Sequence, residues 1–420
     1  MTIHKLTNNE YIVRLLNVGL RGVTLLCKFS LFFVLAFYLA PEEVGLYGLI
    51  VASIAYGIYP LGLEFYTYST RELIKSDKST CGRYLASQIG LYVVLYLIFL
   101  PIFLFLFYFN FLPWYVAVYF YVLLILEHAN QEMMRLLIAL SHQIAASVAL
   151  FLRQGLWVLI VIPVMYLYPD YRSIDFILSL WVLGSIGAAA VSFVTFYNLG
   201  FKGWLSGFDW LWIKKGVLVS LPFFISTLSL SAIATFDRYL FDFFVGRDVL
   251  GAYVFYIGLA ASLISFLDAA VFSFIYPKMI AAYAKEDLIS FNSQVKKMFY
   301  QILTLSFIFF AASFLLIDLI VGWIDKPIYS EHIFIFYIVV IAMFLQALSY
   351  IPHYALYAQG CDNTIVMSHG LSVVIFMVSA FSLSYISELY AVPVALCITY
   401  FLVLVWKTSA YYKRRLFLAS

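Results

Sequence analysis

Five polar side chains recur along the first long apolar stretch of this chain. Arg14, Asn17, Arg21, Thr24 and Lys28 follow one another at alternating spacings of three and four residues. Those spacings place them on one face of an α-helix. Guanidinium and ammonium groups donate charge-assisted hydrogen bonds to phosphate or carboxylate oxygens. The stripe therefore predicts that Arg21 and Lys28, helped by Asn17 and Thr24, line a water-filled cavity that receives an anion.

A second interpretation is that Arg21 and Lys28 neutralise buried acids, while Arg14 reaches the lipid headgroups. The acids within or at the edges of apolar stretches are Glu64, Glu127 and Asp268. Each of these acids is a candidate for structural pairing or for titration during ion coupling. Arg153 lies within a later apolar stretch and is a further candidate for substrate binding.

Other polar patterns are less specific. Gln346, Tyr350 and His353 share a helical face, for which helix packing is the favoured role. His128 and Glu132 stand four residues apart, but they lack a third metal ligand at a suitable spacing, so a cytoplasmic helix end is favoured. The chain contains no P-loop, H-E-x-x-H or G-x-S-x-G motif. We therefore predict no enzyme activity, no metal or cofactor, and no nucleic-acid binding.

The composition excludes a water-soluble fold. Apolar residues make up 65% of the 420 residues, and charged residues make up 11%, against about 25% charged in soluble domains. The apolar runs are long and continuous and do not alternate as barrel strands do. An all-α integral membrane protein is predicted.

Twelve apolar runs are long enough to cross a bilayer, which needs about 20 helical residues. They lie at 15–40, 44–65, 85–109, 114–140, 144–167, 174–198, 216–236, 249–276, 299–321, 332–357, 365–387 and 389–411. The longest polar connection, around 277–298, leaves no room for a soluble domain. We predict two six-helix lobes around a central cavity. The N-terminal lobe, 1–205, would hold helices 1–6, and the C-terminal lobe, 206–420, would hold helices 7–12.

The distribution of basic residues predicts the orientation. Eighteen Lys and Arg residues, Lys407 among them, fall on one side of the predicted spans and four on the other. Because basic loops stay in the cytoplasm, both termini are predicted to be cytoplasmic. The four cysteines have no plausible disulfide partner.

A weak internal match supports two related halves. Gly45-Leu46-Tyr47 and Gly251-Ala252-Tyr253 each place Gly-x-Tyr at the start of a predicted helix, 206 residues apart. Parallel repeats of this kind occur in some transporters. Coincidence is the alternative interpretation.

Three short segments resemble a known family. They are Gly62–Ile74 (GLEFYTYSTRELI), Arg21–Lys28 (RGVTLLCK) and Pro41–Tyr47 (PEEVGLY). Together with the predicted span count, they make the chain similar to the bacterial O-antigen flippases of the multidrug/oligosaccharidyl-lipid/polysaccharide exporter superfamily. The resemblance implies a multi-pass protein of the bacterial inner membrane. It would move undecaprenyl-pyrophosphate-linked O-antigen repeat units to the periplasmic leaflet by alternating access.

The resemblance also implies partners, and the missing nucleotide motif limits the energy sources. The partners would be lipid-linked oligosaccharide, membrane lipids and other O-antigen assembly proteins. Coupling to H+ or Na+ is one energy source, alongside the membrane potential and downstream consumption of the substrate. Two rivals stand beside the flippase. An ion-coupled multidrug antiporter of the same superfamily would favour acids in its cavity, and a membrane O-antigen polymerase would need a large periplasmic loop.

Overall fold

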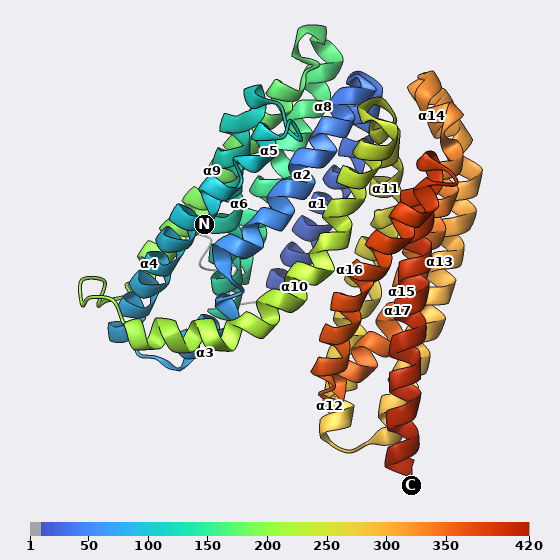
Figure 1. Ribbon diagram of the computed structural model, residues 1–420. Coiled ribbons are helices and arrows are strands. Elements are labelled where there is room, and N and C mark those ends of the chain that lie inside the picture. The colour runs from blue at the N-terminus through green and yellow to red at the C-terminus, as the bar shows by residue number, and fades with distance from the viewer. Residues whose placement is uncertain (1–9, 420) are drawn as a thin grey trace. The chain divides into compact units, whose positions relative to one another are not determined.

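The computed structural model describes residues 10–419, and it describes side chains from Leu15 to Arg414. Within this range every regular element is helical (Figure 1). The N-terminal half contains α1 (Glu10–Tyr38), α2 (Pro41–Gly62), α3 (Tyr66–Lys75), α4 (Lys78–Ile102), α5 (Phe105–Tyr108), η2 (Trp114–Val116), α6 (Ala117–Ala139), α7 (Gln143–Phe151), η3 (Leu152–Leu156), α8 (Trp157–Leu167), η4 (Pro169–Tyr171) and α9 (Ile174–Asn198). The C-terminal half contains α10 (Trp210–Val245), α11 (Arg247–Leu267), η5 (Asp268–Phe272), α12 (Ser273–Ala284), α13 (Leu288–Ile324), α14 (Pro327–Glu331), α15 (Ile333–Ala358), α16 (Asp362–Ser384) and α17 (Glu388–Ala419).

The predicted all-α fold is confirmed, and a helical segment covers each predicted span. In the described part of the chain, eleven segments are long and apolar enough to cross a membrane. The twelfth predicted span corresponds to α6. Its second half carries Glu127, Glu132 and Arg135, so its composition is more polar than that of the other spans. These charges are part of the candidate site described below.

The region predicted as a polar connection, 277–298, is largely helical. α12 continues to Ala284, and α13 begins at Leu288 and runs for 37 residues. Phe291, Met298 and Ile302 are buried along one face of α13. Spacings of seven and four residues keep these side chains on one side of a helix. Buried packing along that face therefore extends the helix through a polar sequence.

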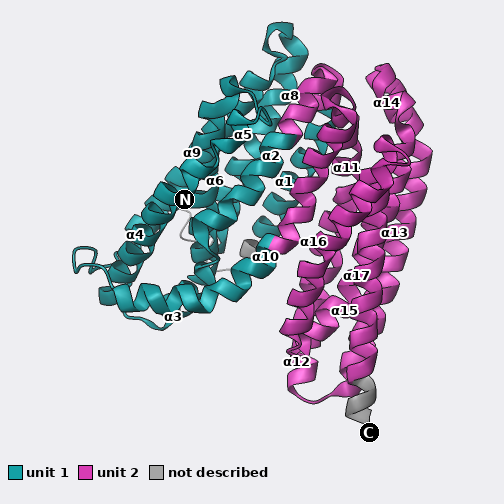
Figure 2. Ribbon diagram, viewed as in Figure 1, with its two compact units in different colours: residues 1–34, 49–228 teal, residues 35–48, 229–420 magenta. Residues whose placement is uncertain are grey.

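The chain forms two compact units, which are coloured separately in Figure 2. Unit 1 contains the chain up to Val34 and Leu49–Leu228. Unit 2 contains Leu35–Gly48 and the chain from Ser229 onward. The boundaries fall inside α1, α2 and α10. In unit 1, Trp212 of α10 stacks on Tyr84 of α4 with ring centroids 4.7 Å apart. These rings belong to an aromatic core that also includes Phe65.

In unit 2, the two Gly-x-Tyr segments lie against each other. A Cβ atom on Gly251 would lie 2.1 Å from the Pro41 carbonyl oxygen, and one on Gly45 would lie 2.7 Å from the Arg247 carbonyl oxygen. Real Cβ atoms do not approach backbone so closely, so only glycine permits this contact between the first turns of α2 and α11. The sequence match therefore coincides with a close helix crossing.

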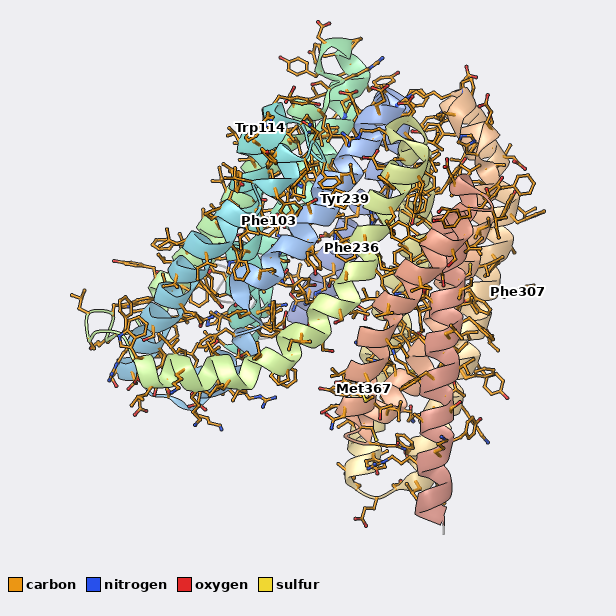
Figure 3. The ribbon with its side chains drawn as sticks, in the orientation of Figure 1. Phe103, Trp114, Phe236, Tyr239, Phe307 and Met367 are labelled. Atoms are coloured by element: carbon orange, nitrogen blue, oxygen red, sulfur yellow. The ribbon has the colours of Figure 1, made fainter. Side chains whose placement is uncertain are left out.

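Large apolar side chains cover much of the outside. Phe307 on α13 is 74% exposed and Met367 on α16 is 61% exposed, and both project away from the helices of unit 2 (Figure 3). Such a surface is unfavourable in water, whereas lipid chains solvate it well.

Candidate functional site

Unit 1 holds a fully buried ion pair. Arg153 and Glu127 are 6% and 4% exposed. Nη2 and Nε of Arg153 lie 2.5 and 2.6 Å from Oε2 of Glu127. Oε1 of Glu127 accepts hydrogen bonds from Nε1 of Trp181 at 3.0 Å and Oγ of Ser185 at 2.9 Å. Both carboxylate oxygens are therefore satisfied, which a buried charge requires.

Local backbone geometry positions Arg153. It lies in η3, a π-helical turn between α7 and α8. Single π-turns inserted in helices often occur at functional sites. A Cβ atom on Gly184 of α9 would lie 2.7 Å from the Leu152 carbonyl oxygen, so the glycine lets α9 approach η3. That approach brings Trp181 and Ser185 of α9 to the Glu127 carboxylate.

A second buried polar cluster surrounds Arg135 of α6. Its Nη1 lies 2.8 Å from Oε1 of Glu132, and its Nη2 lies 3.6 Å from Oε1 of Glu64. The guanidinium also stacks on the Tyr66 ring, 3.7 Å from the centroid. Tyr92 donates its hydroxyl to the other oxygen of Glu132 at 2.5 Å. Arg135 therefore forms ion pairs with both Glu64 and Glu132.

The interpretation of His128 and Glu132 as a cytoplasmic helix end is wrong. They are 2% and 5% exposed, and Nδ1 of His128 lies 2.6 Å from the Tyr96 hydroxyl. Tyr92 and Tyr96 of α4 cover this face of α6, so the polar half of α6 faces protein. In the described residues, no group of three or more His, Cys, Asp or Glu side chains is arranged to hold a metal ion.

The structure does not place the α1 stripe in one environment. Thr24 is 4% exposed and donates to the Leu20 carbonyl at 2.8 Å. Asn17 donates to Oε1 of Gln143 at 3.3 Å. Arg21 and Lys28 are both exposed. The Arg14 side chain lies outside the described side chains.

Two of the three predicted acids pair with cations other than those of the α1 stripe. Glu127 pairs with Arg153, and Glu64 pairs with Arg135. Among the ion pairs of the described side chains, none includes Arg21 or Lys28. Lys28 nevertheless lies close enough to Arg153 and Glu127 to interact with both electrostatically. The alternative interpretation paired Arg21 and Lys28 with buried acids. In the described side chains, neither residue forms an ion pair with Glu64 or Glu127.

Unit 2 contains a buried basic cluster that sequence analysis missed. Nζ of Lys407 lies 3.3 Å from Nδ1 of His353 and 3.3 Å from Nε2 of His369. Lys407 is 4% exposed, and the two imidazole rings stack with centroids 5.7 Å apart. Lys407 was predicted to be one of the loop charges on the cytoplasmic side of the membrane, and its place in a loop is wrong, because it is buried within α17. Three polar residues within the consecutive apolar helices α15, α16 and α17 were the available signal.

Asp268 belongs to a different part of unit 2. It begins η5, a π-helical turn between α11 and α12, and it is exposed. It interacts electrostatically with Tyr350 and Tyr354 of α15. The three acids predicted from the sequence therefore lie in three separate surroundings.

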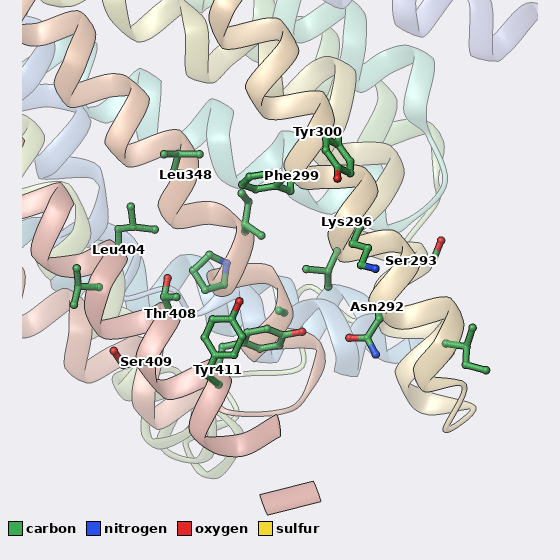
Figure 4. Close-up of a pocket in the computed structure, with 17 residues that line it drawn as sticks. Asn292, Ser293, Lys296, Phe299, Tyr300, Leu348, Leu404, Thr408, Ser409 and Tyr411 are labelled. Carbon is green, nitrogen blue, oxygen red and sulfur yellow. The ribbon is translucent and has the colours of Figure 1, made fainter. Parts of the chain in front are cut away.

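Unit 2 also has an open cavity of about 1050 Å³ between α13, α15 and α17 (Figure 4). Its polar lining includes Asn292, Lys296 and Thr408, and its walls include Phe299 and Leu404. None of the predicted site residues lines it.

Comparisons with known proteins agree on the fold. No family model matches the sequence, and no curated protein matches it. A multidrug-resistance MATE-family transporter of the MOP superfamily in its inward-facing conformation matches with a TM-score of 0.75 at 15% identity, over 94% of both chains. The chain has the MATE fold. This fold comprises twelve helices in two lobes.

Two further MATE-fold structures extend the comparison. An outward-facing MATE-family transporter matches with a TM-score of 0.66 at 15% identity, over 96% of this chain and 94% of the other. A MOP superfamily transporter from Pyrococcus furiosus matches with a TM-score of 0.58 at 13% identity, over 96% of both chains. The binding pocket of the Pyrococcus protein is described as reversed in polarity, suggesting a different function.

Proposed function

We propose that this chain is an alternating-access flippase for undecaprenyl-pyrophosphate-linked O-antigen repeat units in the bacterial inner membrane. One observation carries the proposal. Unit 1 exposes Arg21 and Lys28 on α1, while the acids Glu64 and Glu127 are already occupied by arginines. The accessible charge of this helix is therefore positive, which suits a pyrophosphate.

The depth of Lys28 supports a water-filled surrounding. It lies ten residues before the end of α1 at Tyr38, or about 15 Å along the helix. An exposed charge at such a depth costs about 2.5–3.5 kcal/mol against lipid on insertion scales. Water or a bound anion removes that cost. We therefore assign the exposed face of Lys28 to an aqueous pathway.

The two cations have different roles in this proposal. They are seven residues apart, about 10.5 Å along one helical face. Arg21 contacts the pyrophosphate first through its planar guanidinium, and Lys28 holds it as a mobile point charge. Arg153 has a structural role, because Glu127 neutralises its charge, while Asn17 and Thr24 fix α1 against its neighbours. The polyprenyl tail remains in lipid.

A multidrug antiporter is the nearest rival, because two of the matching structures are described as multidrug-resistance transporters. A cationic drug would be attracted by an accessible acid. In unit 1, Glu64, Glu127 and Glu132 are buried and contact arginine. This arrangement favours an anionic substrate.

The proposal assigns ion coupling to Asp268. Of the three predicted acids, Asp268 alone is exposed, so it is the one best placed to exchange H+ or Na+ with water. If Asp268→Asn flipped the substrate at the wild-type rate, both with and without an imposed ion gradient, ion coupling through Asp268 would be excluded.

The proposal includes two six-helix lobes, 1–205 and 206–420, with both termini in the cytoplasm. Reporter fusions at Glu42, Arg172, Lys326 and Glu388 should be periplasmic, and fusions at Lys78, Lys202, Lys285 and Arg414 should be cytoplasmic. Reversal at two or more sites would contradict the topology.

The function itself is tested by deleting the gene and locating lipid-linked single repeat units by leaflet. A flippase predicts accumulation on the cytoplasmic leaflet. Accumulation on the periplasmic leaflet would instead indicate a polymerase, and no accumulation would favour the antiporter.

A further inference from the structure

Four tyrosines form a continuous row on unit 2. Tyr350 and Tyr354 of α15 stack with ring centroids 5.8 Å apart. Tyr276 of α12 follows, 5.0 Å from Tyr354, and Tyr357 of α15 lies 5.6 Å beyond Tyr276. From Tyr350 to Tyr357 the row covers seven residues of α15, or about 10.5 Å. We call these four residues the tyrosine row.

The tyrosine row is held firmly but remains accessible. Phe272 is 2% exposed and contacts the rings of Tyr350 and Tyr354, each with centroids 5.1 Å apart. Tyr276, Tyr350 and Tyr354 are half-buried, and Tyr357 is 46% exposed. Packing from behind reduces the conformational entropy that the rings would lose on binding a ligand.

Asp268 indicates that this face is wet. Its exposed carboxylate lies 16 residues before the end of α12 at Ala284, which is about 24 Å along the helix. A carboxylate exposed to lipid at that depth is costly, and such residues face the bundle interior or water. Because Asp268 interacts with Tyr350 and Tyr354, the same aqueous face includes the tyrosine row. Tyr357 lies next to the end of α15 at Ala358, where interfacial tyrosines are expected, but Tyr350 lies eight residues, or about 12 Å, inside that helix.

We infer that the tyrosine row binds the sugar rings of the substrate. Pyranose rings have an apolar C–H face and a rim of hydroxyl groups. Tyrosine matches both, because it offers an apolar ring and a hydroxyl that donates and accepts hydrogen bonds. Asp268 adds an acceptor at one end. The inference rests on the proposed function and extends it by assigning the glycan to unit 2.

The basic cluster argues against a different occupant. Tyrosines beside an acid also suit organic cations. Here the His353 ring contacts the rings of Tyr350 and Tyr354, with centroids 5.9 and 5.4 Å away. Nδ1 of His353 in turn lies 3.3 Å from Nζ of Lys407. The ammonium group of Lys407 repels a second cation, whereas an uncharged sugar is indifferent to it.

Two probes test this inference on the full chain in nanodiscs. The first is the lipid-linked repeat unit extracted from cells that lack this chain, and the second is undecaprenyl pyrophosphate carrying one sugar. Wild-type protein should bind the first more tightly. Tyr354→Ala should weaken binding of the first probe about fivefold, from the loss of one aromatic contact, and should leave the second nearly unchanged. Tyr354→Phe keeps the ring, so its affinity for the first probe should lie between those of the wild type and Tyr354→Ala.

Tyr300→Ala is the matched control, because Tyr300 is 65% exposed on α13 and lines the separate cavity of Figure 4. It should bind both probes as the wild type does. Equal wild-type affinities, or equal weakening of both probes by Tyr354→Ala and Tyr354→Phe, would overturn the tyrosine row and leave the flippase intact. Failure of the wild type to bind either probe would overturn both.

Discussion

Two buried cations, Arg153 in unit 1 and Lys407 in unit 2, have different partners. In unit 1, Arg153 and Arg135 contact the buried acids Glu127 and Glu132 at 2.5–2.8 Å. In unit 2, Lys407 is equally buried but its described hydrogen bonds are to two histidines at 3.3 Å. Each partner of a buried ion pair is needed for stability, because removing one partner leaves the other charge buried and unpaired. A lone buried cation costs stability, so retaining it indicates a role other than folding.

Breaking the pair in unit 1 should have the largest effect. Arg153→Ala leaves Glu127 buried, which costs about 3–5 kcal/mol in comparable pairs. We expect a strong loss of monodisperse protein in size-exclusion chromatography and a much lower Tm. The double variant Arg153→Met with Glu127→Gln removes both charges and should recover most of the folded protein. An unchanged Tm for Arg153→Ala would refute the structural role.

The stability of unit 2 should depend on the close contact between the first turns of α2 and α11. Gly251→Ala forces a methyl group into the Pro41 carbonyl oxygen, and overpacking typically costs about 1–3 kcal/mol. A reduced Tm is expected. Gly370→Ala on α16 is the control, because its new Cβ would meet nothing within 4 Å, and it should match or exceed the wild-type Tm. Equal Tm values for the two variants would contradict the α2–α11 contact.

A milder change tests the second cluster of unit 1. Tyr92→Phe removes the 2.5 Å hydrogen bond from the Tyr92 hydroxyl to Oε2 of Glu132 and leaves that oxygen only the 3.5 Å contact with Nε2 of Gln88. A poorly satisfied buried acceptor costs about 1–3 kcal/mol. The Tm should fall by less than in Arg153→Ala. Tyr108→Phe serves as the control, since that ring is 76% exposed on α5. If both variants kept the wild-type Tm, the hydrogen bond would be dispensable.

The smallest effect on stability, and one of opposite sign, is expected at Lys407. Lys407→Met keeps the length of the side chain and removes a buried charge, so the Tm should stay equal or rise. Transport should still decline if the basic cluster acts on the substrate path. A Tm loss as large as that of Arg153→Ala would show that the two units are not different in this respect.

The sequence predicted the helices well because each span is long and apolar. The predicted spans 144–167 and 216–236 are helical despite their internal prolines Pro163 and Pro222, although α10 extends beyond the second span, from Trp210 to Val245. Lys285, Glu286 and Asp287 form the turn between α12 and α13, but the predicted connection around them was too long, reaching residue 298. The helix begins directly after the turn, because Phe291, Met298 and Ile302 are buried along one of its faces.

The site was only partly predictable. Helical spacing placed Thr24 and Lys28 on one face of α1, but Thr24 is buried and Lys28 is exposed, because the neighbouring helices decide which part of a face they cover. Whether Glu127 pairs with Lys28 or Arg153 depends on the rotation of α6 and η3, which spacing alone does not specify. The Lys407 cluster joins three helices, so no single periodic pattern contains it.

The central claim is that Arg21 and Lys28 bind the pyrophosphate, and flipping by charge variants tests it most directly. Proteoliposomes would carry extracted lipid-linked repeat units, and the units reaching the opposite leaflet would be counted per folded protein. Arg21→Ala and Lys28→Ala should each slow flipping at least about tenfold, because a hydrogen bond to a charged group contributes about 1.5–3 kcal/mol. Arg21→Lys should be intermediate, and Lys285→Ala, in an exposed turn, should match the wild type. Wild-type rates from both alanine variants would contradict the account.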